Sequence, residues 1–181
     1  MDQSGEIQQQ NKIRSVFEKI EALPQLLKIM KNNNFEDEDI NLYTTAIIGS
    51  LYKASKLPDE FRRIVIEQLN LAAQHKDKYI AGLSALVFTG LVECVDNHSD
   101  IVAEIIPHTL QKYINEDEYY PVDQGMMLAI NLLQYGSDET KQKVIQAVPK
   151  ERVSEWAEQN EDQRGLMFAA KLLNEWIRFI S

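Results

Sequence analysis

This chain nearly repeats one segment of its own sequence. The residues from Gly125 to Gln134 align without a gap on those from Gly165 to Asn174, about 40 residues later. Both copies follow an acidic stretch and a glutamine, and both place small or apolar residues at helical spacing. Self-similarity at this period is typical of supersecondary units that stack, because one unit cannot bury its apolar face alone. The repeat therefore predicts a stacked architecture and favours recognition of another molecule over catalysis.

Length and composition predict a single all-α domain covering residues 1–181. The chain has 181 residues, of which 44% are apolar, enough for one real core and too few for two comfortable domains. It contains only 7 Gly and 5 Pro, which disfavours a turn-rich β fold. We expect a frayed, Gln-rich start over residues 1–11, capping helices over 12–34 and helical repeats over 39–181.

The repeats divide into alternating first and second helices. First helices are predicted to begin near residues 39, 78, 121 and 161, a spacing of roughly 40 residues. Pro107 should kink one second helix, and Pro149 should separate a short helix over 150–159 from another. The helix from about Lys78 is apolar nearly all round, so we expect it in the middle of the array with Leu86 buried.

Two amphipathic helices in each unit of about 40 residues resemble HEAT and armadillo repeats over residues 39–181. The resemblance implies a short right-handed α-solenoid of stacked helical hairpins. It also implies that the second helices line a concave face that binds proteins or peptides. An irregular multi-helix bundle is the alternative architecture.

The charge of the chain favours a protein partner. There are 28 acidic against 19 basic residues, a formal charge of −9. Such a surface repels nucleic-acid backbones and anionic membranes, so we expect neither as a partner. A protein with a basic surface would instead be attracted by the field. The alternative is that this acidity only keeps the protein soluble.

Carboxylates gather before three of the predicted first helices. If the turns into these helices share one edge of the stack, the carboxylates form an acidic rim for Lys or Arg side chains. Helix capping is the alternative explanation for them. Two tyrosines in one of these turns are either interface residues or packing residues. The candidate partner-binding residues are Glu36, Asp37, Glu38, Asp39, Glu116, Asp117, Glu118, Tyr119, Tyr120, Glu158, Glu161 and Asp162.

Metal and cofactor chemistry finds no anchor in the sequence. Cys94 is the only cysteine and is expected to be a small buried hydrophobe. Glu104 and His108 are one helical turn apart, but Pro107 disturbs that turn and no third ligand is evident. The phosphate-loop, dinucleotide-binding and nucleophile-elbow motifs do not occur. We therefore expect no catalytic residue, no metal and no cofactor.

Localisation is predicted from the N-terminus and from the lengths of the apolar runs. The first residues lack the basic and apolar regions of a signal peptide. No apolar run approaches the roughly 20 residues needed to span a bilayer. We expect a cytoplasmic protein.

These features together predict a module that binds another protein. By analogy of size and charge, it would be a stoichiometric inhibitor such as the immunity protein of a bacterial toxin. An adaptor or scaffold with several partners is the alternative. A third possibility is a HEAT-like nucleic-acid enzyme, which needs a basic concave face. The basic residues available for such a face are Arg62, Arg63, Lys112, Lys141 and Lys143.

Overall fold

The computed structural model describes residues 3–31, 38–105, 109–158 and 164–180, and this part of the chain contains helices and no strand. The helices are α1 (Gln3–Lys19), α2 (Ala22–Lys31), α3 (Glu38–Leu51), α4 (Asp59–Ala73), α5 (Lys78–Leu91), the 3₁₀ turn η1 (Val95–Asn97), α6 (His98–Ile105), α7 (Thr109–Asn115), α8 (Tyr119–Tyr135), α9 (Asp138–Ala147), α10 (Lys150–Glu158) and α11 (Arg164–Ile180). The predicted all-α class is confirmed. Within the described residues, no helix is long and apolar enough to cross a membrane.

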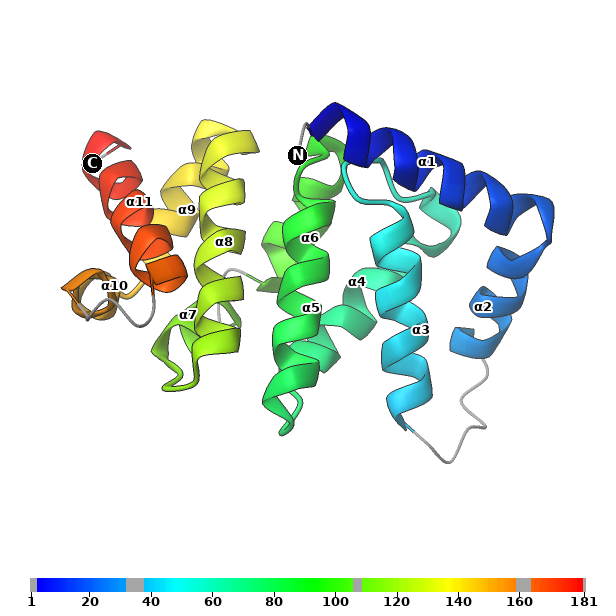
Figure 1. The fold of residues 1–181 in the computed structure, drawn as a ribbon, viewed down its shortest axis with the longest axis horizontal. Helices are drawn as coiled ribbons and strands as arrows, with labels where there is room; N and C mark the ends of the chain where they lie inside the picture. Colours follow the sequence, from blue (N-terminus) through cyan, green and yellow to red (C-terminus); the bar gives the residue numbers. More distant parts are fainter. Residues whose placement is uncertain (1–2, 32–37, 106–108, 159–163, 181) are drawn as a thin grey trace.

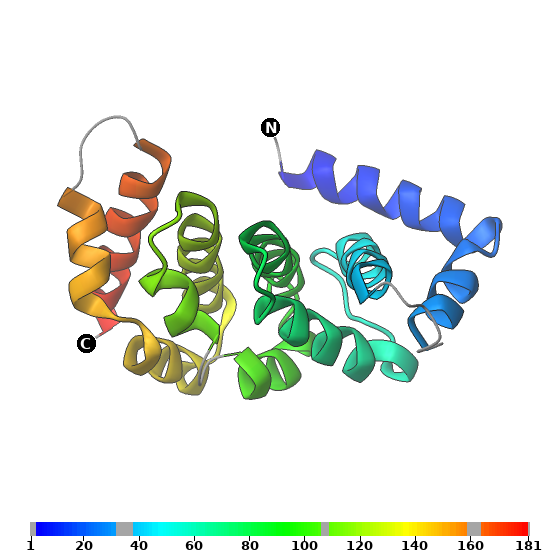
Figure 2. The ribbon, with the colours of Figure 1, turned by 90° about the horizontal axis from the view of Figure 1, so that it is seen from below.

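The helices form two layers that bend into an arch. Helices α3, α5, α8 and α11 lie side by side in the front layer of Figure 1, with α4, α6 and α9 behind them. Figure 2 shows the arch from below, with the front layer on its concave side. Helix α1 crosses that concave side near one end, and α10 flanks α11 at the other end.

The helices that line the concave side are those predicted to come first in each unit. The resemblance to HEAT repeats implied that the second helices would line it. The packing includes the predicted pairs of α3 with α4 and of α8 with α9, but α4 also packs against α5, α7 against α8, and α10 against α11. After α5 the chain passes through η1, and α6 then packs against α4. Helix α4 thus packs against the first helices on both sides of it, and packing is not restricted to the predicted hairpins.

Helix boundaries follow the sequence signals with small shifts. Residues 3–11, predicted to be frayed, form the first part of α1. The break between α1 and α2 falls at Glu21, whose φ is 53°, and Pro24 lies in the first turn of α2, where proline is tolerated. Helix α6 ends at Ile105 and α7 begins at Thr109, and the kink predicted at Pro107 lies outside the described residues. Pro149 separates α9 from α10, as predicted.

Helix α5 is central, but one of its sides is open. It packs against α3, α4 and α8, and its residue Phe88 is fully buried. Leu86, which we expected to be buried, is 47% exposed. The expectation was wrong because apolar residues occur on nearly all sides of α5. The neighbouring helices α3, α4 and α8 cover three of these sides and leave the concave side open.

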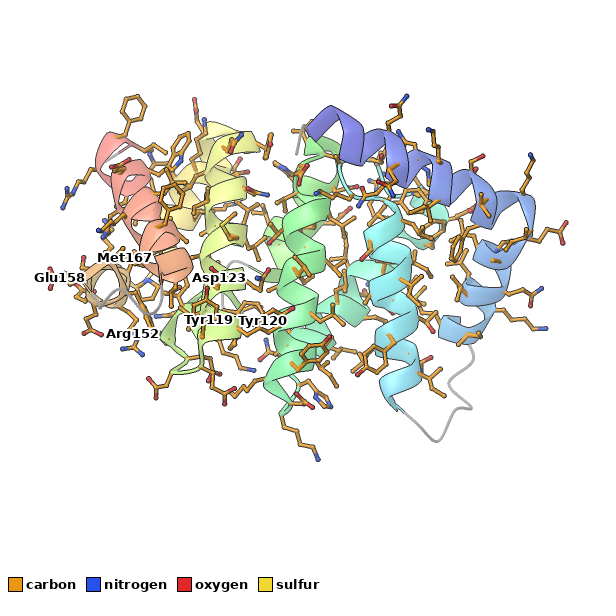
Figure 3. The ribbon with its side chains drawn as sticks, in the orientation of Figure 1. Tyr119, Tyr120, Asp123, Arg152, Glu158 and Met167 are labelled. Atoms are coloured by element: carbon orange, nitrogen blue, oxygen red, sulfur yellow. The ribbon has the colours of Figure 1, made fainter. Side chains whose placement is uncertain are left out.

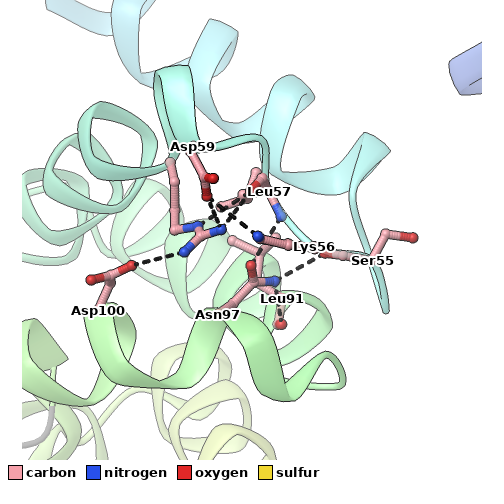
Figure 4. A network of polar contacts seen from close by, with 8 residues as sticks. Ser55, Lys56, Leu57, Asp59, Leu91, Asn97 and Asp100 are labelled. Atoms are coloured by element: carbon pink, nitrogen blue, oxygen red, sulfur yellow. Dashed lines mark hydrogen bonds and ion pairs between the residues drawn. The ribbon is translucent and has the colours of Figure 1, made fainter.

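A buried amide fixes the loop between α3 and α4 (Figure 4). Asn97 in η1 is fully buried, and its Oδ1 accepts a hydrogen bond of 2.9 Å from the backbone N–H of Leu57. Its Nδ2 donates to the carbonyls of Ser55 and Leu91, at 3.0 Å each. The side chain thereby bonds three backbone groups near the helix ends, of which the carbonyl of Leu91 also accepts the N–H of Cys94 at 3.2 Å.

The repeated segment falls on α8 and α11, which pack against each other. Four buried positions are shared by the two copies. Three others differ, because Gly125, Leu128 and Leu132 are buried whereas their counterparts Gly165 and Phe168 are exposed and Leu172 is half-buried. The shared buried pairs are Met126 and Leu166, Ala129 and Ala169, Ile130 and Ala170, and Leu133 and Leu173.

Candidate protein-binding face

The predicted acidic residues are only partly within the described structure. Helix α3 begins at Glu38, and the side chains of Glu38 and Asp39 lie outside the described part. The predicted site residues beyond the described part altogether are Glu36, Asp37, Glu161 and Asp162. Four carboxylates can be placed: Glu116, Asp117 and Glu118 just before α8, and Glu158 at the end of α10.

Two of these carboxylates pair with the chain's own cations. Glu116 forms an ion pair with Lys78 at the start of α5. Asp117 lies 2.7 Å from Nη2 of Arg152 in α10. The same guanidinium donates to the carbonyl of Glu116 at 3.2 Å and lies over the ring of Trp156, 4.9 Å from its centroid. These contacts tie the turn before α8 to its neighbours, so Glu116 and Asp117 contribute to the fold.

Two other carboxylates carry no such structural role in the described part of the chain. Glu118 is the N-cap residue of α8, and its side chain makes no capping hydrogen bond. Glu158 is exposed at the C-terminal end of α10. Figure 3 shows Glu158 apart from Arg152, which lies six residues, or about 9 Å, earlier along the helix.

The two tyrosines diverge from the first turn of α8 (Figure 3). Tyr119 is 41% exposed, and its hydroxyl lies 2.9 Å from the point that a Cβ on Gly165 of α11 would occupy. Tyr120 is half-buried and lies on Gly82 of α5. Its ring stacks on Tyr79, with the ring centroids 5.8 Å apart. One tyrosine therefore reaches α11 and the other reaches α5.

Asp123 lies on the same face of α8, one helical turn beyond the tyrosines (Figure 3). Its side chain is half-buried, and the carboxylate accepts a hydrogen bond of 3.0 Å from Nε2 of Gln124. Burial raises the pKa of Asp123 above the usual value for an aspartate, and the Gln124 hydrogen bond opposes that rise. Among the described residues, no Lys, Arg or His forms an ion pair with this carboxylate.

Sequence reasoning did not select Asp123. The predicted site was defined by runs of carboxylates, whereas Asp123 is a single acidic residue within an apolar helix. The available signal was its spacing of four residues from Tyr119 and three from Tyr120, which places all three on one helical face.

The rest of the concave layer adds apolar and aromatic surface. Each of α3, α5 and α8 carries exposed residues of this kind. The exposed residues are Ile40, Tyr43 and Ile47 on α3, Tyr79 and Leu86 on α5, and Tyr119 and Met127 on α8. Large apolar residues exposed together mark interaction surfaces more often than singly scattered ones do.

The basic residues considered for a nucleic-acid face belong to other helices. They lie on α4, α7 and α9, not on the four helices that line the concave side. Arg62 pairs with Asp59 and Asp100, and Lys112 donates to the carbonyl of Ala73. Arg63 pairs with Glu67, Lys141 with Asp138, and Lys143 with Glu139.

The remaining candidate groups are structural or outside the described part. Cys94 is half-buried, and Nε2 of the buried His98 lies 2.5 Å from the carbonyl of Val92. Glu104 and His108, which the sequence analysis considered and did not select as metal ligands, lie outside the described side chains. Within the described residues there is no group of three His, Cys, Asp or Glu side chains that could hold a metal ion.

Comparison with known proteins identifies a similar fold. No protein-family model matches the sequence. No curated protein matches it either. The crystal structure of an engineered protein from the Northeast Structural Genomics Consortium superimposes with a TM-score of 0.69 over 94% of this chain and 68% of that chain. The two sequences are 12% identical, so the likeness is one of fold.

Proposed function

We propose that this protein is an interaction module that binds a basic segment of another protein on its concave face. The observation that carries the proposal is Asp123, a half-buried carboxylate with no cationic partner in the described structure. A buried charge without a partner is costly. A Lys or Arg side chain from a partner would offset that cost by pairing with it.

The surroundings of Asp123 suit a cation on a protein chain. Tyr119 and Tyr120 flank the carboxylate on the same helical face. Aromatic rings attract Lys and Arg side chains, and tyrosine is enriched among the residues that dominate binding energy. Asp123 is therefore the anchor of the proposed site, and the two tyrosines are its walls.

The acidic rim has a narrower role in this proposal than in the original prediction. Glu116 and Asp117 already hold cations of the chain itself. Glu118 and Glu158 are exposed and remain available to attract a basic partner. Exposed charges of this kind raise the association rate more than the affinity, and salt screens their effect.

A stoichiometric inhibitor, such as the immunity protein of a bacterial toxin, is one form of this module. An adaptor with several weaker partners is the other. The two differ in stoichiometry and affinity, since an inhibitor binds one partner at nanomolar affinity or tighter. Affinity purification of the tagged protein at low and high salt separates them: one basic protein in equal amount indicates an inhibitor, and several substoichiometric partners indicate an adaptor.

The anchor is tested with a matched pair of variants and a library of basic peptides. Asp123→Asn removes the unpaired charge, whereas Asp117→Asn removes a carboxylate that Arg152 already holds. Losing a charged hydrogen bond costs about 1.5–3 kcal/mol, so Asp123→Asn should weaken binding roughly 10-fold or more. Asp117→Asn should leave the affinity nearly unchanged. Equal affinities of wild type and Asp123→Asn would contradict the proposed anchor.

A further inference from the structure

Helix α11 leaves one of its sides uncovered at the end of the arch (Figures 1 and 2). It packs mainly against α8 and α10, and its residues Leu166, Ala170 and Ile177 are buried. On the opposite side, Phe168 is 69% exposed and Phe179 is 87% exposed. These two residues are about three helical turns apart, so they share one face of α11. We call this uncovered side the outer face of α11.

The counterpart of the outer face on α8 is covered. Leu128 and Leu132 of α8 are buried, and α8 lies between α5 and α11 in the front layer. The corresponding residues of α11 are Phe168, which is exposed, and Leu172, which is half-buried. The last helix of a stacked array needs a polar outer surface to be soluble by itself. The outer face of α11 instead carries residues suited to a covered position.

The spacing along the outer face is the same in both chain directions. Its residues Phe168, Leu172, Glu175 and Phe179 follow one another at steps of four, three and four. Steps of three and four form a continuous seam along a helix, and two such seams can pack against each other. If a second copy of α11 runs antiparallel, Phe168 of each copy meets Phe179 of the other, and Leu172 meets Glu175. The outer face is thus complementary to itself.

The charges on α11 favour the antiparallel arrangement. Lys171 precedes Glu175 by four residues, and neither forms an ion pair within the described part of the chain. In the antiparallel pair, Glu175 of one copy and Lys171 of the other differ by one residue, or about 1.5 Å, along the helix axis. A parallel pair would place the two Glu175 carboxylates against each other, where they repel. Charge complementarity therefore points to a second, antiparallel copy.

We propose that two copies of this protein associate through the outer faces of their α11 helices, which pack antiparallel about a two-fold axis. Such an interface is isologous, because each copy contributes the same residues. One helix from each copy buries less area than a standard interface, so the dissociation constant should be micromolar. The inference goes beyond the proposed function and does not depend on it, because Asp123 belongs to α8 and not to the outer face of α11.

Sedimentation velocity of the full chain over a wide range of concentrations tests the association. The wild type should pass from monomer to dimer in the micromolar range. Phe168→Glu should weaken the association at least about 100-fold, because each dimer loses two apolar contacts and gains two unpaired charges. Leu71→Glu charges a similarly exposed residue of α4 and is the matched control, which should leave the association unchanged. Both variants should remain folded in thermal denaturation, since both positions are exposed.

A charge exchange tests the antiparallel register. Lys171→Glu should weaken the homodimer, and so should Glu175→Lys, because each places like charges opposite one another across the interface. Mixed together, the two variants should form a heterodimer, since each then presents the charge opposite to that of its partner. The heterodimer should associate at least about 10-fold more tightly than either variant does with itself. An ion pair between Lys171 and Glu175 of one chain would give no such recovery.

Three results would overturn the inference: a wild type that stays monomeric at roughly millimolar concentration, equal weakening by Phe168→Glu and Leu71→Glu, or no gain on mixing the charge variants. Asp123→Asn should leave the association unchanged while it weakens the binding of a basic peptide. A failure of the dimer proposal therefore appears in sedimentation, and a failure of the basic-segment proposal appears in peptide binding.

Discussion

Tyr120 of α8 lies against Gly82 of α5 so closely that a Cβ on Gly82 would be only 2.3 Å from the tyrosine ring. Because Gly82 has no side chain, the Tyr120 ring can stack on Tyr79. The ring then forms the side of the proposed site that is next to α5. Gly82→Ala should force the ring to move and destabilise the protein by about 1–3 kcal/mol. Chemical denaturation measures the loss, and peptide titration should show weaker binding of a basic segment.

Gly90 supplies the control on the same helix. A Cβ at Gly90 would be 3.1 Å from Cγ of Lys53, part of a flexible side chain. Gly90→Ala should therefore cost nothing, and it should gain up to about 1 kcal/mol from the higher helix propensity of alanine. If both variants have the same stability, the close packing of Tyr120 on Gly82 does not matter energetically.

A second prediction concerns the open side of α5. Leu86 is 47% exposed, whereas Phe88, two residues later, is fully buried. Phe88→Asp should unfold the protein, because a buried unpaired charge costs several kcal/mol against a total stability of roughly 5–15 kcal/mol. Leu86→Asp should cost about 1 kcal/mol or less and remain cooperatively folded in thermal denaturation. An unfolded Leu86→Asp protein would mean that the concave side is covered.

The sequence predicted which segments are helical because their apolar residues recur at helical spacing. It also predicted the split at Pro149 and the shared helical pattern of the two repeated segments. It could not predict the exposure of Leu86, since periodicity carries no information when a helix is apolar on all sides. The contacts of α4 with α5 and of α6 with α4 were equally hidden, because they depend on packing between helices and not on the periodicity within one helix.

The candidate site was harder to predict than the fold. The acidic runs stood out by composition, but Lys78 and Arg152, which neutralise two of their members, come from segments distant in sequence. For Asp123 the sequence shows only its spacing from Tyr119 and Tyr120. Its half-burial depends on how α8 packs among its neighbours.

A third prediction tests the buried amide of Asn97. Asn97→Leu keeps a similar volume but leaves the N–H of Leu57 and the carbonyl of Ser55 without the Asn97 amide, while the carbonyl of Leu91 keeps its bond from Cys94. Each buried unpaired group costs about 1–3 kcal/mol, so the variant should lose at least about 2 kcal/mol in chemical denaturation. Asn115→Leu, at an exposed position in α7, is the matched control and should change stability by about 0.5 kcal/mol or less. Equal stabilities would show that water replaces the amide.

The last prediction follows from the raised pKa of Asp123. In the folded protein, burial favours the protonated carboxyl, so its pKa lies above the usual 3.8. The resulting contribution to stability is fully present below pH 3.8 and is lost as pH rises through the raised pKa. The side chain introduced by Asp123→Asn cannot ionise. The stability of Asp123→Asn relative to the wild type should therefore increase as pH rises from 3.8 through the raised pKa of Asp123, and stay constant at higher pH. Thermal denaturation of both proteins across this pH range measures the difference.

Gln124 allows the sign of this effect to be checked independently. Its hydrogen bond to Asp123 lowers the pKa and so opposes the effect of burial. Removing it in Gln124→Leu should move the midpoint of the stability difference to higher pH. Affinity for a basic peptide should change in the opposite sense to stability, because the ionised carboxylate that costs folding free energy is the form that binds a cation. If the stability difference between wild type and Asp123→Asn does not vary with pH, the carboxyl is as well solvated in the folded chain as in the unfolded one. That result would remove the main reason for regarding Asp123 as an anchor.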